Sequence, residues 1–176
     1  MGTIQLLPPT TEEEWTHVEN LITEFKEWDA QQCQALGFDR DEVLSVFYPD
    51  DMGAIRRDSV PPGGRFLLAV DANSPLGCAG FRSLTSSECE LYDVYVRPGA
   101  RGRGVASMLL HRLMGDAKAV GYQGMVLETA VFMLSAHSLY RALQFQTREP
   151  YRAIPEKFAE ATLWMECRLS GLSARL

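Results

Sequence analysis

The sequence lacks the patterns that mark membrane-spanning and nucleic-acid-binding proteins. No apolar run approaches the length of a bilayer span, and the start MGTIQLLPPTTEEEW has no positive region followed by an apolar stretch. Acids outnumber lysine and arginine, which gives a net charge of -6 and a pI near 5.1. This charge disfavours DNA, RNA and anionic lipid as partners and favours a cationic small substrate. We expect a cytoplasmic protein with no nucleic-acid or membrane partner.

Cysteine is scarce and has no metal-binding spacing. The four cysteines form no CxxC pair, and with three scattered histidines they make no ligand cluster, so no metal is expected. Cys78 and Cys89 are close in sequence, but a hairpin turning near Ser86 would set them roughly 20 Å apart at about 3.3 Å per residue. We expect all four to be free, buried thiols.

The chain has no repeats, low-complexity tracts or linker, and its 176 residues predict one domain covering residues 1–176. A helix is predicted to begin at a capping box of Thr10 or Thr11 with Glu13 or Glu14 and to continue to Trp28. Residues 37–64 are irregular, with a short helix near 41–47. The remaining predicted elements are strands at 3–7, 65–71, 76–84, 89–96, 125–130 and 160–169, and helices at 105–120 and 135–143. The three consecutive strands predict an antiparallel meander.

The segment VRPGARGRGVASMLLHRLM, residues 96–114, concentrates arginine and glycine where a strand meets a helix. A helix N-terminus has unpaired amide hydrogens and a partial positive charge, so it binds anions. Glycine allows close approach of the backbone, and the added arginines indicate several negative oxygens, such as those of a pyrophosphate. If this loop is considered without the rest of the sequence, the alternative interpretation is a solvent-exposed basic turn at the start of an ordinary helix.

Two other phosphate-binding patterns fit this loop poorly. The P-loop pattern GxxxxGK[ST] is absent, which argues against a nucleotide hydrolase. A dinucleotide-binding module is the closer alternative, because Gly102 and Gly104 give GxG and Glu128 lies about where a ribose-binding acid is expected. However, the third position of that pattern is Ser107, and the preceding strands are expected to be antiparallel.

The stretch ELYDVYVRPGARGRGVASMLL resembles the acyl-CoA binding motif of the GNAT superfamily of N-acyltransferases. The loop of that family follows R/Q-x-x-G-x-G/A, which Arg101, Gly104 and Ala106 match. LYRALQF is similar to the L-Y-x-x-x-G-F of the family, with Gln144 in place of the usual glycine. The resemblance covers nearly the whole chain and is strongest in residues 90–145.

The resemblance implies an α/β fold of the α+β type, with a mixed, mostly antiparallel sheet of about seven strands and about four flanking helices. The sheet would be splayed between its fourth and fifth strands, with acetyl-CoA as co-substrate in the gap. The acceptor would enter from the opposite side, near residues 28–64, whose acidic balance fits a cationic amine. The residues that the resemblance assigns to acetyl-CoA are Val94, Tyr95, Val96, Arg101, Gly102, Arg103, Gly104, Val105 and Ala106.

Attack of an amine on a thioester requires a neutral amine. With a pKa near 10.4, about one amine in 2,500 is neutral at pH 7, which costs about 4.6 kcal/mol, so a general base is useful. The resemblance places a catalytic glutamate at Glu90, which by in-out alternation shares a face with Tyr92, Val94 and Val96. A surface acid at a strand start is the alternative for Glu90.

Other side chains could also move protons. Asp93, Tyr92 and Tyr95 are further candidates for the base, whereas His137 is more typical of a surface histidine. Tyr140 matches the general-acid tyrosine of the family, whose hydroxyl lies near the thioester sulfur. Packing of the ring within the helix is the alternative for Tyr140.

These observations predict an N-acetyltransferase that moves an acetyl group from acetyl-CoA to a primary amine of a small molecule or peptide, by direct attack in a ternary complex. A protein-lysine or N-terminal acetyltransferase and a catalytically silent acyl-CoA-binding sensor are the alternatives. The sequence does not specify the acceptor or the acyl chain length, and it leaves a homodimer open.

Overall fold

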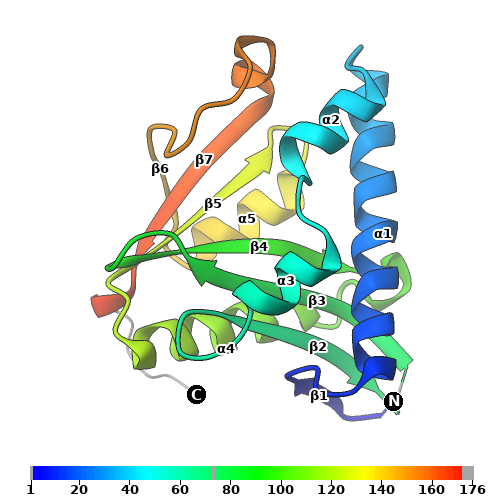
Figure 1. The fold of residues 1–176 in the computed structure, drawn as a ribbon, viewed down its shortest axis with the longest axis vertical. Coiled ribbons are helices and arrows are strands. Elements are labelled where there is room, and N and C mark those ends of the chain that lie inside the picture. The colour runs from blue at the N-terminus through cyan, green and yellow to red at the C-terminus, as the bar shows by residue number, and fades with distance from the viewer. Residues whose placement is uncertain (1, 73, 172–176) are drawn as a thin grey trace.

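The computed structural model describes residues 2–72 and 74–171, which form a seven-stranded sheet in the order β1-β2-β3-β4-β5-β7-β6 (Figure 1). The strands are β1 Ile4–Leu7, β2 Arg65–Asp71, β3 Ser74–Ser83, β4 Glu88–Val96, β5 Gly124–Ala130, β6 Gln146–Thr147 and β7 Thr162–Arg168. The helices are α1 Glu12–Ala35, α2 Arg40–Phe47, α3 Met52–Asp58, α4 Val105–Val120 and α5 Leu134–Ala142. Short 3₁₀ segments lie at Pro98–Ala100, Glu156–Ala161 and Leu169–Gly171.

The sheet is splayed at its one parallel strand pair. All other neighbouring strands are antiparallel, whereas β4 and β5 run parallel and pair only from Glu88↔Gly124 to Glu90↔Val126. Beyond Glu90 the two strands diverge (Figure 1). Within the described residues, the backbone of residues 91–96 therefore has no strand partner on the side of β5, which confirms the expected mixed sheet and its opening.

Helices cover both faces of the sheet because the central strands are apolar on both sides. In β2, Leu67 and Ala69 pack in the cluster that contains α4, whereas Phe66 and Leu68 pack with α1 and α3. A strand whose alternate residues are all apolar can be buried on two faces. The opening between the splayed strands therefore lies in a sheet that is covered by helices on both faces.

The first helix begins where the capping signal predicts. The Glu14 amide donates to Thr11 Oγ1 at 3.2 Å, and the Thr11 amide donates to Glu14 Oε2 at 2.9 Å. This reciprocal pair satisfies two helix-end donors. The buried side of α1 then carries its apolar residues and one acid, Asp29.

A bulge in β4 corrects one expectation about the strand. Two residues of β4, Asp93 and Val94, lie opposite one residue of β3, and Asp93 has a φ of 51°. An extra residue reverses the alternation of side chains beyond it. Tyr92 therefore packs on the α1 side, whereas Val94 and Val96 pack on the α4 side. The prediction that Glu90 and Tyr92 share a face with the two valines is wrong for this reason.

The structure adds elements that the hydrophobic spacing did not predict. Helix α3 lies in the segment expected to be irregular, and its N-cap Asp51 accepts from the Ala54 amide at 2.8 Å. Strand β6 has only two residues, too few for a periodic signal. The α-helices are five rather than about four in the described residues. The four cysteines are free and buried, as predicted.

Candidate active site

The glycine loop, residues 101–106, presents a row of free backbone donors. Gly102 and Gly104 adopt φ values of 75° and 78°, a conformation that favours glycine. Within the described residues, the amides of residues 102–107 donate no hydrogen bond, and the first bond of α4 runs from the Met108 amide to Gly104 O at 2.9 Å. These amides open a 16-residue helix at its positive end, an arrangement that can bind an anion.

A cavity of about 580 Å³ lies between this loop, β4 and α5, and we call it the loop pocket. Its lining includes eight of the nine residues expected to hold acetyl-CoA, namely Val94, Tyr95, Val96, Arg101, Gly102, Gly104, Val105 and Ala106. The free backbone edge of β4 and the free amides of the loop therefore face one cavity.

The two loop arginines have different surroundings. Arg101 Nε donates to Val96 O at 3.2 Å, and its guanidinium lies over the Trp28 ring at the wall of the loop pocket. Arg103 instead forms an ion pair with Asp71 at the end of β2, and its side chain does not line the pocket. Arg103 thus contributes its backbone amide to the loop, while its guanidinium anchors the loop to the sheet.

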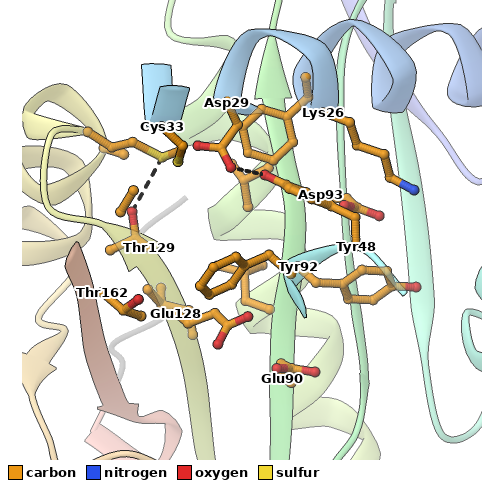
Figure 2. Close-up of a pocket in the computed structure, with 18 of the residues that line it drawn as sticks. Lys26, Asp29, Cys33, Tyr48, Glu90, Tyr92, Asp93, Glu128, Thr129 and Thr162 are labelled. Carbon is orange, nitrogen blue, oxygen red and sulfur yellow. Dashed lines mark hydrogen bonds between the residues drawn. The ribbon is translucent and has the colours of Figure 1, made fainter. Parts of the chain in front are cut away.

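A second, smaller cavity of about 140 Å³ lies on the other side of the opening, and we call it the acidic pocket. Figure 2 shows carboxylates reaching it from three elements: Asp29 from α1, Glu90 and Asp93 from β4, and Glu128 from β5. Residues expected to lie near the acceptor, in the segment 28–64, form much of its wall. The two cavities meet, because the same five residues line both: Phe25, Val94, Met133, Ala136 and Tyr140.

Glu90, the predicted base, is fully engaged by neighbours. Its side chain is buried, Oε2 accepts from Arg82 Nε at 2.7 Å, and Oε1 accepts from the Tyr151 hydroxyl at 2.7 Å. Arg82 also pairs with Asp50, so one guanidinium joins two acids. Both Glu90 oxygens therefore have donors before any substrate is present, and Glu90 is not the surface acid of the alternative interpretation.

Asp93 is the carboxylate of this site that is best suited to act as a general base. It lies in the β4 bulge at the splay, lines the acidic pocket, and its carboxylate forms no hydrogen bond within the described residues. Burial raises the pKa of Asp93 from 3.8 to about 6, and the charges of Asp50 and Glu90 add to this rise, while Lys26 and Arg82 oppose it. A carboxylate with this pKa is ionised at neutral pH and holds a proton better than an ordinary aspartate.

Tyr140 lies where the two pockets meet. Its ring packs against Phe145 with 5.7 Å between centroids, and its hydroxyl forms no hydrogen bond within the described part of the chain. Burial raises the pKa of the Tyr140 hydroxyl, which keeps it protonated. The side chain is therefore both packed and available as a donor.

The remaining proton-transfer candidates are held by other contacts. The Tyr92 hydroxyl is 2.5 Å from Ser59 Oγ, and the Tyr95 hydroxyl donates to Glu24 Oε2 at 3.4 Å. His137 is buried, which corrects the surface position expected for it, and its Nε2 is 3.0 Å from Ala130 O. His137 lines neither pocket, so it joins α5 to the end of β5.

Some residues of the site were missed from sequence. Asp29 carried a readable signal, because it stands four residues after Phe25 and four before Cys33 on the apolar side of α1. Arg82, Tyr151 and Arg152 carried none, since only the fold brings them to Glu90 and Glu128.

No three histidine, cysteine, aspartate or glutamate side chains are arranged to hold a metal ion in residues 2–72 and 74–171. None of the helices in this part of the chain combines the length and apolar character needed to cross a bilayer.

Comparison with known proteins gives consistent matches. A family model described as "Acetyltransferase (GNAT) family" matches residues 5–145. An uncharacterised N-acetyltransferase of Schizosaccharomyces pombe is 34% identical over 132 residues, which cover 74% of this chain and 79% of the relative. A GNAT-family acetyltransferase structure from Staphylococcus aureus superposes with a TM-score of 0.73 at 17% identity, covering 95% of this chain and 99% of the other. The PaiA N-acetyltransferase of Thermoplasma acidophilum, in complex with coenzyme A, superposes with a TM-score of 0.68 at 16% identity and covers 94% and 99%.

Proposed function

The chain belongs to the acetyltransferase (GNAT) family, and from this premise we propose that it transfers the acetyl group of acetyl-CoA to a primary amine of a small molecule. The observation that carries the proposal is the meeting of two chemically different cavities at Tyr140. One cavity has free amides for an anionic, extended ligand, and the other has carboxylates for a cationic one.

The loop pocket has the donor set that acetyl-CoA requires. Six consecutive free amides beside Arg101 suit a pyrophosphate, and the free edge of β4 suits the amide groups of a pantetheine arm. The structural relative that contains coenzyme A has the same fold and supports this assignment. When bound, acetyl-CoA supplies an acetyl group activated as a thioester.

Asp93 acts as the general base in this proposal. With a pKa of about 6 it is about nine-tenths ionised at pH 7, and it faces the pocket that attracts ammonium groups. It takes the proton of the acceptor ammonium, and the nitrogen lone pair then attacks the thioester carbonyl. Glu90 acts indirectly, by fixing Arg82 and by keeping the pKa of Asp93 high.

Tyr140 acts as the general acid. Its hydroxyl is protonated and unpaired at the junction of the pockets, so it can donate a proton to the departing sulfur. Attack forms the C–N bond, and collapse of the tetrahedral intermediate then breaks the C–S bond. The nitrogen loses its second proton in this step, which restores the Tyr140 hydroxyl, and the products are an N-acetyl amine and the free thiol.

Direct attack fits the site better than a covalent acyl-enzyme. Cys33 is the one cysteine among the residues lining the two described pockets, and burial together with the charge of Asp29 raises its pKa to about 12. A thiol with this pKa is almost entirely protonated at neutral pH and is a poor nucleophile. The acceptor amine therefore attacks without a protein-bound intermediate.

The acceptor side is enclosed, which favours a small molecule over a folded protein. Residues 148–161 cross from β6 to β7 and contact α2. The Phe158 ring meets Phe47 edge to face, Lys157 pairs with Glu42, and Arg152 Nη2 donates to Val46 O at 3.4 Å. These contacts connect the segment of residues 148–161 to α2, and Phe47 and Phe158 both line the acidic pocket.

A panel of amines assayed for release of the CoA thiol tests the proposal. We expect thiol release with small cationic amines and little with an internal lysine of a peptide. Binding of acetyl-CoA without thiol release from any amine would support the sensor and overturn the transferase.

A further inference from the structure

Asp29 is a buried carboxylate with one unpaired oxygen. The residue is 4% exposed and lines the acidic pocket, where Oδ2 accepts from the Tyr48 hydroxyl at 2.8 Å. Its other oxygen, Oδ1, has no hydrogen-bond partner in the described residues. Buried carboxylate oxygens are normally paired, and an unpaired one is unfavourable. The group that Asp29 lacks is a hydrogen-bond donor.

Three other acids of the acidic pocket are each paired with an arginine. Glu90 and Asp50 share Arg82, and Glu128 pairs with Arg152. Asp29 and Asp93 are the two acids on the described pocket wall that have no cation within ion-pair distance. If Asp93 serves the reacting nitrogen, Asp29 is available for a second positive group of the same ligand.

The wall next to Asp29 suits an alkyl chain that ends in a cation. The rings of Phe25 and Tyr48 meet edge to face with 5.7 Å between centroids, and Phe47 lines the same cavity. Aromatic rings pack against methylene groups and attract a positive charge at their faces. The region therefore combines an apolar channel with a carboxylate beside it.

The two unpaired carboxylates also lie close enough for one small ligand. Asp29 and Asp93 line the same cavity of about 140 Å³, and Asp29 accepts from the Tyr48 hydroxyl at its wall. The two carboxylates therefore face one small cavity, so a single short ligand can contact both.

We propose that Asp29 binds a second, permanently protonated nitrogen of the acceptor, so that the substrates are short diamines rather than simple alkylamines. The inference rests on the proposed acetyl transfer and adds the substrate class. One nitrogen loses its proton to Asp93 and is acetylated, while the other stays an ammonium and donates to Asp29 Oδ1.

Calorimetry in the presence of saturating coenzyme A tests this independently of turnover. The probes are 1,4-diaminobutane and pentylamine, which differ by one ammonium replaced with a methyl group. We expect the native protein to bind the diamine roughly 10- to 100-fold more tightly, the range of one charge-assisted hydrogen bond. Asp29→Asn, which keeps the shape of the side chain, should remove this preference without changing the affinity for pentylamine.

Glu19→Gln is the matched control, because Glu19 is an exposed acid on the same helix. It should keep the preference, which shows that the general charge of the protein does not cause it. The affinity for coenzyme A and the melting temperature report whether the Asp29→Asn variant folds. The comparison of the two probes on native protein needs no variant.

Equal affinity of native protein for the two probes, no measurable diamine binding, or an unchanged preference in a folded Asp29→Asn protein would each overturn the inference. Failure of the proposed function gives a different result, in which the diamine binds through Asp29 but no amine releases thiol from acetyl-CoA.

Discussion

The Tyr151 hydroxyl donates a hydrogen bond of 2.7 Å to Glu90 Oε1. With Arg82 on the other oxygen, this contact leaves Glu90 as a structural acid and Asp93 as the free carboxylate of β4. The division of roles between two acids three residues apart follows from the bulge, which presents Asp93 to the pocket.

Replacing Asp93 by asparagine should remove the base. We expect turnover at pH 7 to fall roughly 100- to 10,000-fold, the usual contribution of a general base. In native protein, kcat/KM should fall below about pH 6 as Asp93 is protonated. The Asp93→Asn variant should lack this acidic limb of the pH–rate profile, and its turnover should rise as the pH approaches the pKa of the amine. A pH–rate profile that is the same in both proteins excludes Asp93.

Glu90→Gln should give a different pH profile. The negative charge of Glu90 raises the pKa of Asp93, so removing it should move the acidic limb to lower pH without abolishing it. Profiles of kcat/KM from pH 5 to 10 measure the shift. Complete loss of the limb in Glu90→Gln, with the limb retained in Asp93→Asn, would assign the base to Glu90.

Asp93 should also reduce stability at neutral pH. Its pKa is raised in the folded protein, so the folded state favours the protonated form, and the penalty for the charged form is present above about pH 6 and absent below the unfolded value near 3.9. Asp93→Asn should therefore stabilise the protein at pH 8 by on the order of 1–3 kcal/mol and have little effect at pH 4. Urea denaturation at the two pH values measures this difference. An equal change in the free energy of unfolding at the two pH values would mean that burial does not penalise the charged form of Asp93.

Tyr140→Phe separates proton donation from packing. The ring and its contact with Phe145 remain, so the melting temperature and acetyl-CoA affinity should change little. Turnover should fall roughly tenfold to a thousandfold, because the leaving sulfur loses its donor. Thiol release on one responsive amine gives the rate. Native turnover in a variant that binds normally would make Tyr140 a packing residue alone.

Gly104→Leu should impair the glycine loop. A leucine at a φ of 78° is strained by about 1–2 kcal/mol, so the amides of the loop should lose their arrangement. We expect coenzyme A affinity to fall at least about tenfold, that is, by about 1.4 kcal/mol. Gly115→Leu is the control, since Gly115 lies within α4 and an added Cβ meets nothing within 4 Å there. Equal affinities in both variants would contradict the role of the loop.

The sequence predicted the fold and the position of the glycine loop before α4, because both depend on local signals. The capping box of Thr11, the apolar period of α4 and the glycines before it are each readable within a few residues. The bulge at Asp93 has no such signal, since it arises from the pairing of β4 with β3. The partners of Glu90 were also hidden, because Tyr151 lies 61 residues away in sequence and only the fold brings it there.

A single-turnover experiment distinguishes direct acetyl transfer between the two pockets from transfer through the protein. Native protein loaded with one equivalent of acetyl-CoA is mixed with 1,4-diaminobutane, and the thiol, the acetylated amine and the mass of the protein are followed together. Direct transfer gives one N-acetyl diamine for each thiol released, at the same rate, with the protein mass unchanged throughout. Thiol release without acetylated amine, or an acetylated protein that forms before the product, would contradict direct transfer between the two pockets.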